Sequence, residues 1–81
     1  MNKESTMTAA AEIDLLTDPM GPDELRAARA AFGVTLQGMA DMLGLTGVHS
    51  KDTVRAWESG RNPVSGPAAV AIRLLLERRR A

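Results

Sequence analysis

One stretch of this 81-residue chain carries polar side chains at the spacing of a single helix face. Lys51, Asp52, Arg55 and Ser59 fall within one side of a helical wheel on which each residue advances about 100°. An arginine can donate two hydrogen bonds to a guanine edge, and a carboxylate can accept one from the cytosine amino group. Because a carboxylate repels phosphate, Asp52 fits either a base contact or the orientation of Lys51 or Arg55. The pattern suits the reading of base edges, and it also suits an ordinary solvated helix face.

Four further residues near this stretch have the chemistry for phosphate contacts. Arg61 and Asn62 directly follow the expected helix and can bind phosphates that fix the position of a protein along DNA. Thr35 and Ser50 are residue types that cap helix N-termini, where free N–H groups also bind anions. These four residues extend the expected contact surface for nucleic acid.

The chain lacks the residue sets of the common catalytic and metal centres. It has no cysteine, and its one histidine, His49, has no evident companion ligands. The glycine-rich loop 44–50 lacks both the Lys-Ser/Thr ending and the preceding strand of a phosphate-binding P-loop. No pattern of nucleophile, base and acid is typical of covalent catalysis. We therefore expect a protein that is not an enzyme and that uses no cofactor or metal ion.

The net charge of zero hides an uneven distribution of charge. Residues 1–24 hold one basic and six acidic side chains, whereas residues 25–81 hold nine basic and four acidic ones. A basic body is compatible with a polyanionic partner such as DNA, and a solvated surface of mixed charge gives the same counts. No apolar run approaches the roughly 20 residues of a membrane span. The sequence thus predicts a cytoplasmic, nucleoid-associated protein with no membrane partner.

Composition and local signals predict that this surface is built on helices. Only Phe32 and Trp57 are aromatic, and the abundant Ala, Leu, Met and Arg favour helices. Proline, N-cap residues and glycine mark where helices begin and end. The expected helices run from Pro22 to a stop at Gly33, from a cap at Thr35 to Gly44, from a cap at Ser50 to Gly60, and from Pro67 onward.

The chain is expected to form one helical domain that follows a short N-terminal extension. Residues 21–81 form the domain, and residues 1–20 form an acidic N-terminal extension that is either a short helix or disordered. In the third expected helix, Thr53, Val54 and Trp57 are placed on the apolar face, whereas Ala56 falls on the polar side. This assignment makes one side of that helix part of the core and leaves the other side for a partner.

The last expected helix is apolar on nearly all sides. A chain of this size has difficulty burying all of these side chains, so part of the helix is expected to contact a second copy in a homodimer. The residues expected at this dimer interface are Val70, Leu74, Leu75 and Leu76.

Two segments resemble the lambda-repressor and Cro type of DNA-binding domain, also called the XRE family. They are residues 33–45, with the sequence GVTLQGMADMLGL, and residues 53–61, with the sequence TVRAWESGR. The resemblance implies an all-α fold, a compact four- to five-helix bundle that contains a helix-turn-helix. It also implies a dimeric transcriptional repressor that binds an inverted-repeat operator. Small phage regulators and antitoxins of toxin–antitoxin operons are similar, which suggests a phage or mobile-element context.

The same resemblance assigns roles to three more residues. Many members carry a phosphate-contacting glutamine directly after the cap of the second helix. Here Leu36 occupies that position and Gln37 follows it, so Gln37 is the expected counterpart. Similar domains pair an arginine with a glutamate at the positions of Arg29 and Glu58, which are therefore expected to form a structural ion pair. The turn at 46–49 is longer than is usual in the family.

An alternative function uses the same helical body differently. An antitoxin-type protein-interaction module would bind a toxin or another protein partner through the N-terminal extension. Folding of residues 1–20 only on addition of such a partner would favour this alternative over a repressor that acts through DNA alone.

Overall fold

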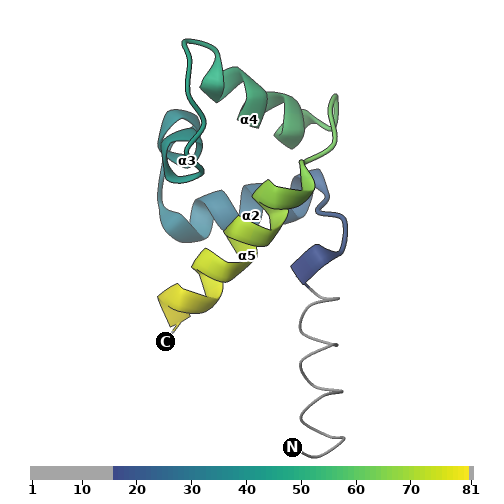
Figure 1. Cartoon of the computed structure of the whole chain (residues 1–81), viewed down its shortest axis with the longest axis vertical. Helices are drawn as coiled ribbons and strands as arrows, with labels where there is room; N and C mark the ends of the chain where they lie inside the picture. Colours follow the sequence, from purple (N-terminus) through teal and green to yellow (C-terminus); the bar gives the residue numbers. More distant parts are fainter. Residues whose placement is uncertain (1–15, 81) are drawn as a thin grey trace, which may run out of the picture.

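The computed structural model describes residues 16–80, in which all regular structure is helical (Figure 1). Leu16 and Thr17 are helical, and residues 1–15 of the expected N-terminal extension lie outside the described residues. The all-α class is thus confirmed for residues 16–80. The helices are α2 (Pro22–Phe32), α3 (Leu36–Met42), α4 (Ser50–Ser59) and α5 (Gly66–Arg80).

The ends of α2 follow the local signals in the sequence. Pro22 occupies the first turn, where a missing N–H costs nothing, and two acidic residues follow it near the positive end of the helix dipole. Gly33 ends the helix in the left-handed conformation, with φ of 69°. Its N–H donates to the carbonyls of Arg29 (3.0 Å) and Ala30 (3.1 Å). A residue with a Cβ would be strained at this φ, so the glycine fixes the turn into α3.

The predicted cap of α3 is confirmed, whereas the predicted cap of α4 is wrong. The Thr35 Oγ1 accepts a hydrogen bond from the N–H of Gly38 at 3.0 Å. In α4 the N-cap position is His49, which makes no side-chain cap bond, and Ser50 is the first helical residue. A backbone turn precedes this helix: the Ser50 N–H donates to the Gly47 carbonyl at 3.3 Å, and the Asp52 N–H to the His49 carbonyl at 3.0 Å. Backbone carbonyls thus replace the side-chain cap at this helix start.

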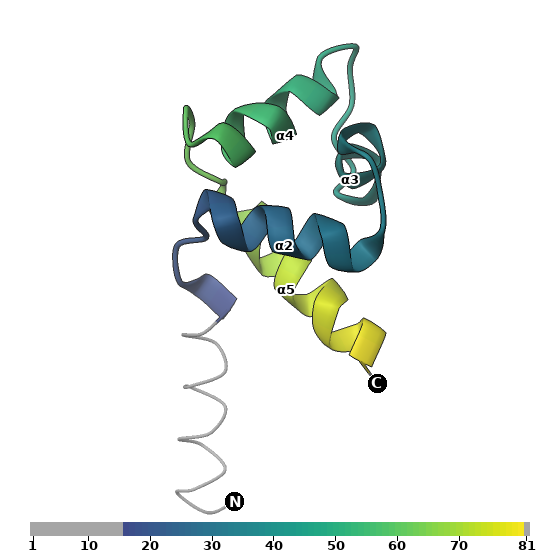
Figure 2. The same cartoon turned by 180° about the vertical axis from the view of Figure 1, so that it is seen from behind.

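Each of the helices α2 to α5 contributes a large, fully buried side chain to the core. Leu25, Met39, Val54 and Ile72 all have 0% exposure, which stabilises the fold by about 1.5–3 kcal/mol for each side chain. The two views in Figures 1 and 2 show α5 crossing α2, with α3 and α4 on the far side of α2 from the C-terminus. The core therefore joins all four helices in one unit.

The buried side of α4 differs from the helical-wheel prediction. Val54 and Trp57 are buried as expected, but Thr53 is exposed and Ala56 has only 3% exposure. The chain after Gly60 turns back toward the helix, and the Asn62 N–H donates to the Ala56 carbonyl at 3.2 Å. The buried residues of α4 thus include Ala56 and not Thr53.

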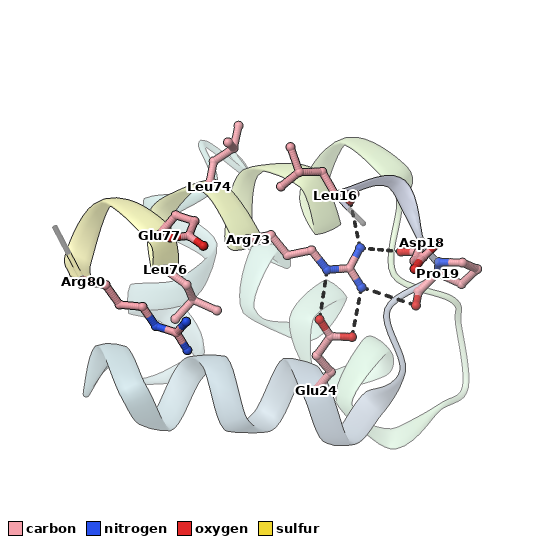
Figure 3. A pocket seen from close by; sticks show the side chains of 9 residues that line it. All are labelled: Leu16, Asp18, Pro19, Glu24, Arg73, Leu74, Leu76, Glu77 and Arg80. Atoms are coloured by element: carbon pink, nitrogen blue, oxygen red, sulfur yellow. Dashed lines mark hydrogen bonds and ion pairs between the residues drawn. The ribbon is translucent and has the colours of Figure 1, made fainter. Parts of the chain in front are cut away.

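The segment before α2 is fixed to α5 by Arg73 (Figure 3). The Arg73 guanidinium forms a two-bond pair with the Glu24 carboxylate, with both distances 2.9 Å. It also donates to the carbonyls of Leu16 (2.8 Å), Asp18 (2.5 Å) and Pro19 (3.4 Å). Next to these residues, Met20 has 6% exposure and belongs to the core. Residues 16–20, expected in the extension, therefore contact the helical body.

Candidate functional site

The candidate site is the outer side of α4 together with the turn that follows it. In Figure 1, α3 is seen nearly end-on whereas α4 is seen along its length, and the loop between them lies at the end of the molecule farthest from the C-terminus. Lys51 and Arg55 are exposed, and Asp52 is half-buried. Arg61 and Asn62 are exposed just beyond the C-terminal end of α4. The predicted residues Lys51, Asp52, Arg55, Arg61 and Asn62 thus lie on accessible surface of one short helix and its turn.

The opposite side of α4 is fixed by an ion pair with α2. Arg29 Nε donates to Glu58 Oε2 at 2.6 Å, and Arg29 Nη2 donates to Glu58 Oε1 at 3.1 Å. The Glu58 side chain is 9% exposed and the Arg29 side chain 29%. Arg29 Nη1 also donates to the Val34 carbonyl at 3.3 Å, and Arg26 Nη1 to the Glu58 carbonyl at 2.5 Å. The two residues expected to pair are therefore in contact, and they tie α4 to α2.

The electrostatics of this pair follow from its hydrogen bonds. Hydrogen bonding to Glu58 is the largest influence on the pKa of Arg29 and raises it, against the opposing effect of partial burial. The pKa of Arg73 is raised in the same way, chiefly by its hydrogen bonds to Glu24. Both guanidinium groups are therefore charged at neutral pH.

On the exposed side, Asp52 lies between two neighbours. His49 Nδ1 is 3.3 Å from Asp52 Oδ2, and Arg55 Nη1 donates to Asp52 Oδ1 at 3.3 Å. The side chains of His49, Asp52 and Arg55 are 85%, 42% and 62% exposed. The contact between His49 and Asp52 follows from their spacing of three residues at a helix start, which the sequence contains.

Four predicted contact residues have side chains that form hydrogen bonds within the protein. Ser50 has 5% exposure, and its hydroxyl accepts from Gln37 Nε2 at 3.1 Å, so this side chain is buried at the contact between α3 and α4. Gln37 Nε2 also donates to Asp41 Oδ1 at 3.0 Å. The Ser59 hydroxyl donates to the Ala56 carbonyl at 3.0 Å and accepts from the Arg61 N–H at 3.3 Å. Thr35, Gln37 and Ser59 remain on the surface, with side chains that already have partners.

The four residues expected at a dimer interface differ in exposure along α5. Leu74 is 51% exposed, whereas Val70 and Leu75 are half-buried. Leu76 is half-buried and packs against the core cluster, so it serves the fold within one chain. The exposed part of this apolar helix is therefore centred on Leu74.

A pocket of about 770 Å³ lies beside α5, between that helix and residues 16–19 (Figure 3). Arg73 lies in its wall, and all five of its N–H groups already donate hydrogen bonds to Glu24 or to backbone carbonyls. The sequence predictions missed this residue. The available signal was a single basic residue within the apolar stretch 68–76.

Residues 16–80 offer no group of three or more His, Cys, Asp or Glu side chains placed to hold a metal ion. Within the same part of the chain, no helix has the length and apolar character to cross a membrane. Comparison with protein-family models, with curated protein sequences and with solved structures gave no match to this chain.

Proposed function

We propose that this protein binds double-stranded DNA in a sequence-dependent way, with α3 and α4 as a helix-turn-helix and α4 in the major groove. The observation that carries the proposal is the division of α4 into two sides. Val54, Trp57 and Glu58 fix one side to the body, while Lys51 and Arg55 extend from the exposed surface. A helix held in this manner can present base-reading side chains without first becoming ordered.

The charges around α4 support the same function. Arg61 follows the helix and is exposed, which suits a phosphate contact at the edge of the groove. Arg55 has the donor geometry for guanine O6 and N7. We assign base recognition to α4 and backbone positioning to Arg61 and its neighbour Asn62.

A dimeric repressor is the form of this function that we propose. Leu74 is a large apolar side chain of α5 that is 51% exposed, which supports contact with a second copy. A two-fold dimer reads an inverted repeat, with half-sites about 34 Å apart, and occupancy of such a site within a promoter blocks transcription.

Selection of bound sequences from random DNA, followed by measurement of the salt dependence of binding, tests this function. A dimer that neutralises about 6 phosphates should give a slope of log K against log salt near −5. The double variant Lys51→Ala/Arg55→Ala should lose the selected preference. The matched control Arg78→Ala/Arg79→Ala removes the same amount of charge at the last turn of α5, which lies away from α4 (Figure 1). This control should keep the selected preference.

A flat salt response, or no enriched sequence at low salt, would refute DNA binding. Binding of a protein partner through residues 1–20, without any DNA binding, would instead support the interaction-module alternative.

A further inference from the structure

Asp52 is an acidic residue on the face of α4 that we assign to DNA. Its two carboxylate oxygens point to different neighbours, Oδ2 to His49 and Oδ1 to Arg55, each at 3.3 Å. The three residues are spaced three apart at the start of α4, so they lie along one line of the helix surface. The carboxylate is therefore held from both sides along the helix.

Stability does not account for this arrangement. All three side chains are at least 42% exposed, and ion pairs on exposed surface contribute little to the free energy of folding. A carboxylate on this face also opposes the approach of phosphate, which lowers affinity for every DNA sequence. An acidic residue here therefore lowers non-specific binding, and its benefit has to lie in recognition.

The Arg55 side chain has Asp52 as its one hydrogen-bond partner within residues 16–80. The bond uses Nη1 and leaves Nε and Nη2 without an acceptor. An arginine held by a carboxylate loses fewer rotamers when it binds, and its remaining N–H groups have a fixed direction. A guanine edge needs two parallel donors in one plane, so it gains from such an orientation.

Resting on the proposed function, we propose that Asp52 is a positioning residue that orients Arg55 toward one guanine, with His49 restraining the other carboxylate oxygen. Asp52 does not itself read a base. The alternative, in which Asp52 accepts from a cytosine amino group, predicts a different position of base preference.

The test compares base preference at every operator position for the wild type and four variants. Asp52→Ala is expected to reduce discrimination about tenfold at the same position at which Arg55→Ala abolishes it, and to raise affinity for random DNA. Asp52→Asn keeps an acceptor oxygen and is expected to retain most of the discrimination. In the double variant Asp52→Ala/Arg55→Ala, loss of Asp52 is expected to cause no further loss of preference.

Three outcomes overturn the proposal while leaving DNA binding intact. Loss of preference at another position, persisting in the Arg55→Ala background, would make Asp52 a base reader. Uniformly higher affinity with unchanged preference would make Asp52 a repulsive charge alone. Equal loss of preference in Asp52→Asn and Asp52→Ala would show that an acceptor oxygen at this position is not enough to orient Arg55. If the wild type binds no DNA sequence, the proposed function fails and this proposal fails with it.

Discussion

Replacement of Glu58 by alanine tests how α4 is attached to the body. The change removes both carboxylate bonds of Arg29, at 2.6 and 3.1 Å, and leaves Arg29 one bond, to the Val34 carbonyl. Breaking a fully buried ion pair costs about 3–5 kcal/mol. Arg29 is 29% exposed, so water replaces part of what it loses. We therefore expect Glu58→Ala to lower the free energy of unfolding by about 2 kcal/mol, which is a typical contribution of hydrogen bonds to charged groups.

Thermal unfolding followed by circular dichroism measures this loss. For a domain of this size, a loss of 1 kcal/mol lowers Tm by about 4–8 °C, so about 8–16 °C is expected. Glu77→Ala is the matched control, because Glu77 is an exposed glutamate on α5 without a hydrogen bond or ion pair in residues 16–80. The free energy of unfolding of Glu77→Ala, obtained from its Tm in the same way, should lie within about 0.5 kcal/mol of the wild-type value.

A double variant separates the pair itself from the space it fills. Arg29→Met/Glu58→Leu removes both charges and keeps apolar volume, so it should recover much of the stability lost in Glu58→Ala.

The pH of the measurement does not affect the contribution of Arg29. Because the pKa of Arg29 is raised, the stability from its charged form is lost only as the pH rises through that raised pKa, above the pH of any such melt. An unchanged Tm for Glu58→Ala would refute the assignment of Glu58 as the anchor of α4.

Three further predictions concern binding, the segment before α2, and assembly. Arg55→Ala should cost about 1–3 kcal/mol at one base position, whereas Arg61→Ala should weaken all sequences alike and reduce the salt slope by about 1; identical effects would refute the division of roles. Arg73→Ala removes the bonds to Glu24 and to the segment 16–19, so hydrogen exchange should accelerate there, and unchanged protection would contradict this. Leu74→Glu should leave Tm near the wild type, give monomers in sedimentation and weaken operator binding; an unchanged mass would exclude Leu74 from a dimer interface.

The helix boundaries could be predicted because the signals that set them are local. Gly33 and Gly60 adopt positive φ, of 69° and 80°, directly after α2 and α4. Thr35 caps α3 through a bond to a residue three positions away. Serine also favours N-cap positions, but the Ser50 hydroxyl accepts a hydrogen bond from Gln37, which lies 13 residues earlier in the chain. The Ser50 side chain therefore forms a contact between two helices and does not cap α4.

The contacts that could not be predicted are those between distant residues. Arg73 and Glu24 are 49 positions apart, and neither spacing nor composition indicates that they meet. The burial of Met20 also depends on Arg73, because the Arg73 side chain donates a hydrogen bond to the carbonyl of the preceding residue, Pro19. Arg29 and Glu58 were paired only through the family resemblance. On α4, Ala56 is buried and Thr53 is exposed, because burial depends on how the helix packs against the rest of the chain, which a helical wheel does not contain.

The core side of α4 determines where its outer side points. Adjacent residues on a helix differ by about 100° in direction, so a change in the rotation of α4 would move Arg55 away from any groove it faces. Val54, Trp57 and the Arg29–Glu58 pair set this rotation through their burial. Under the proposed function, the stability of this pair and the accuracy of base reading are therefore linked. Glu58→Ala should therefore weaken discrimination between sequences even at temperatures at which the variant is folded.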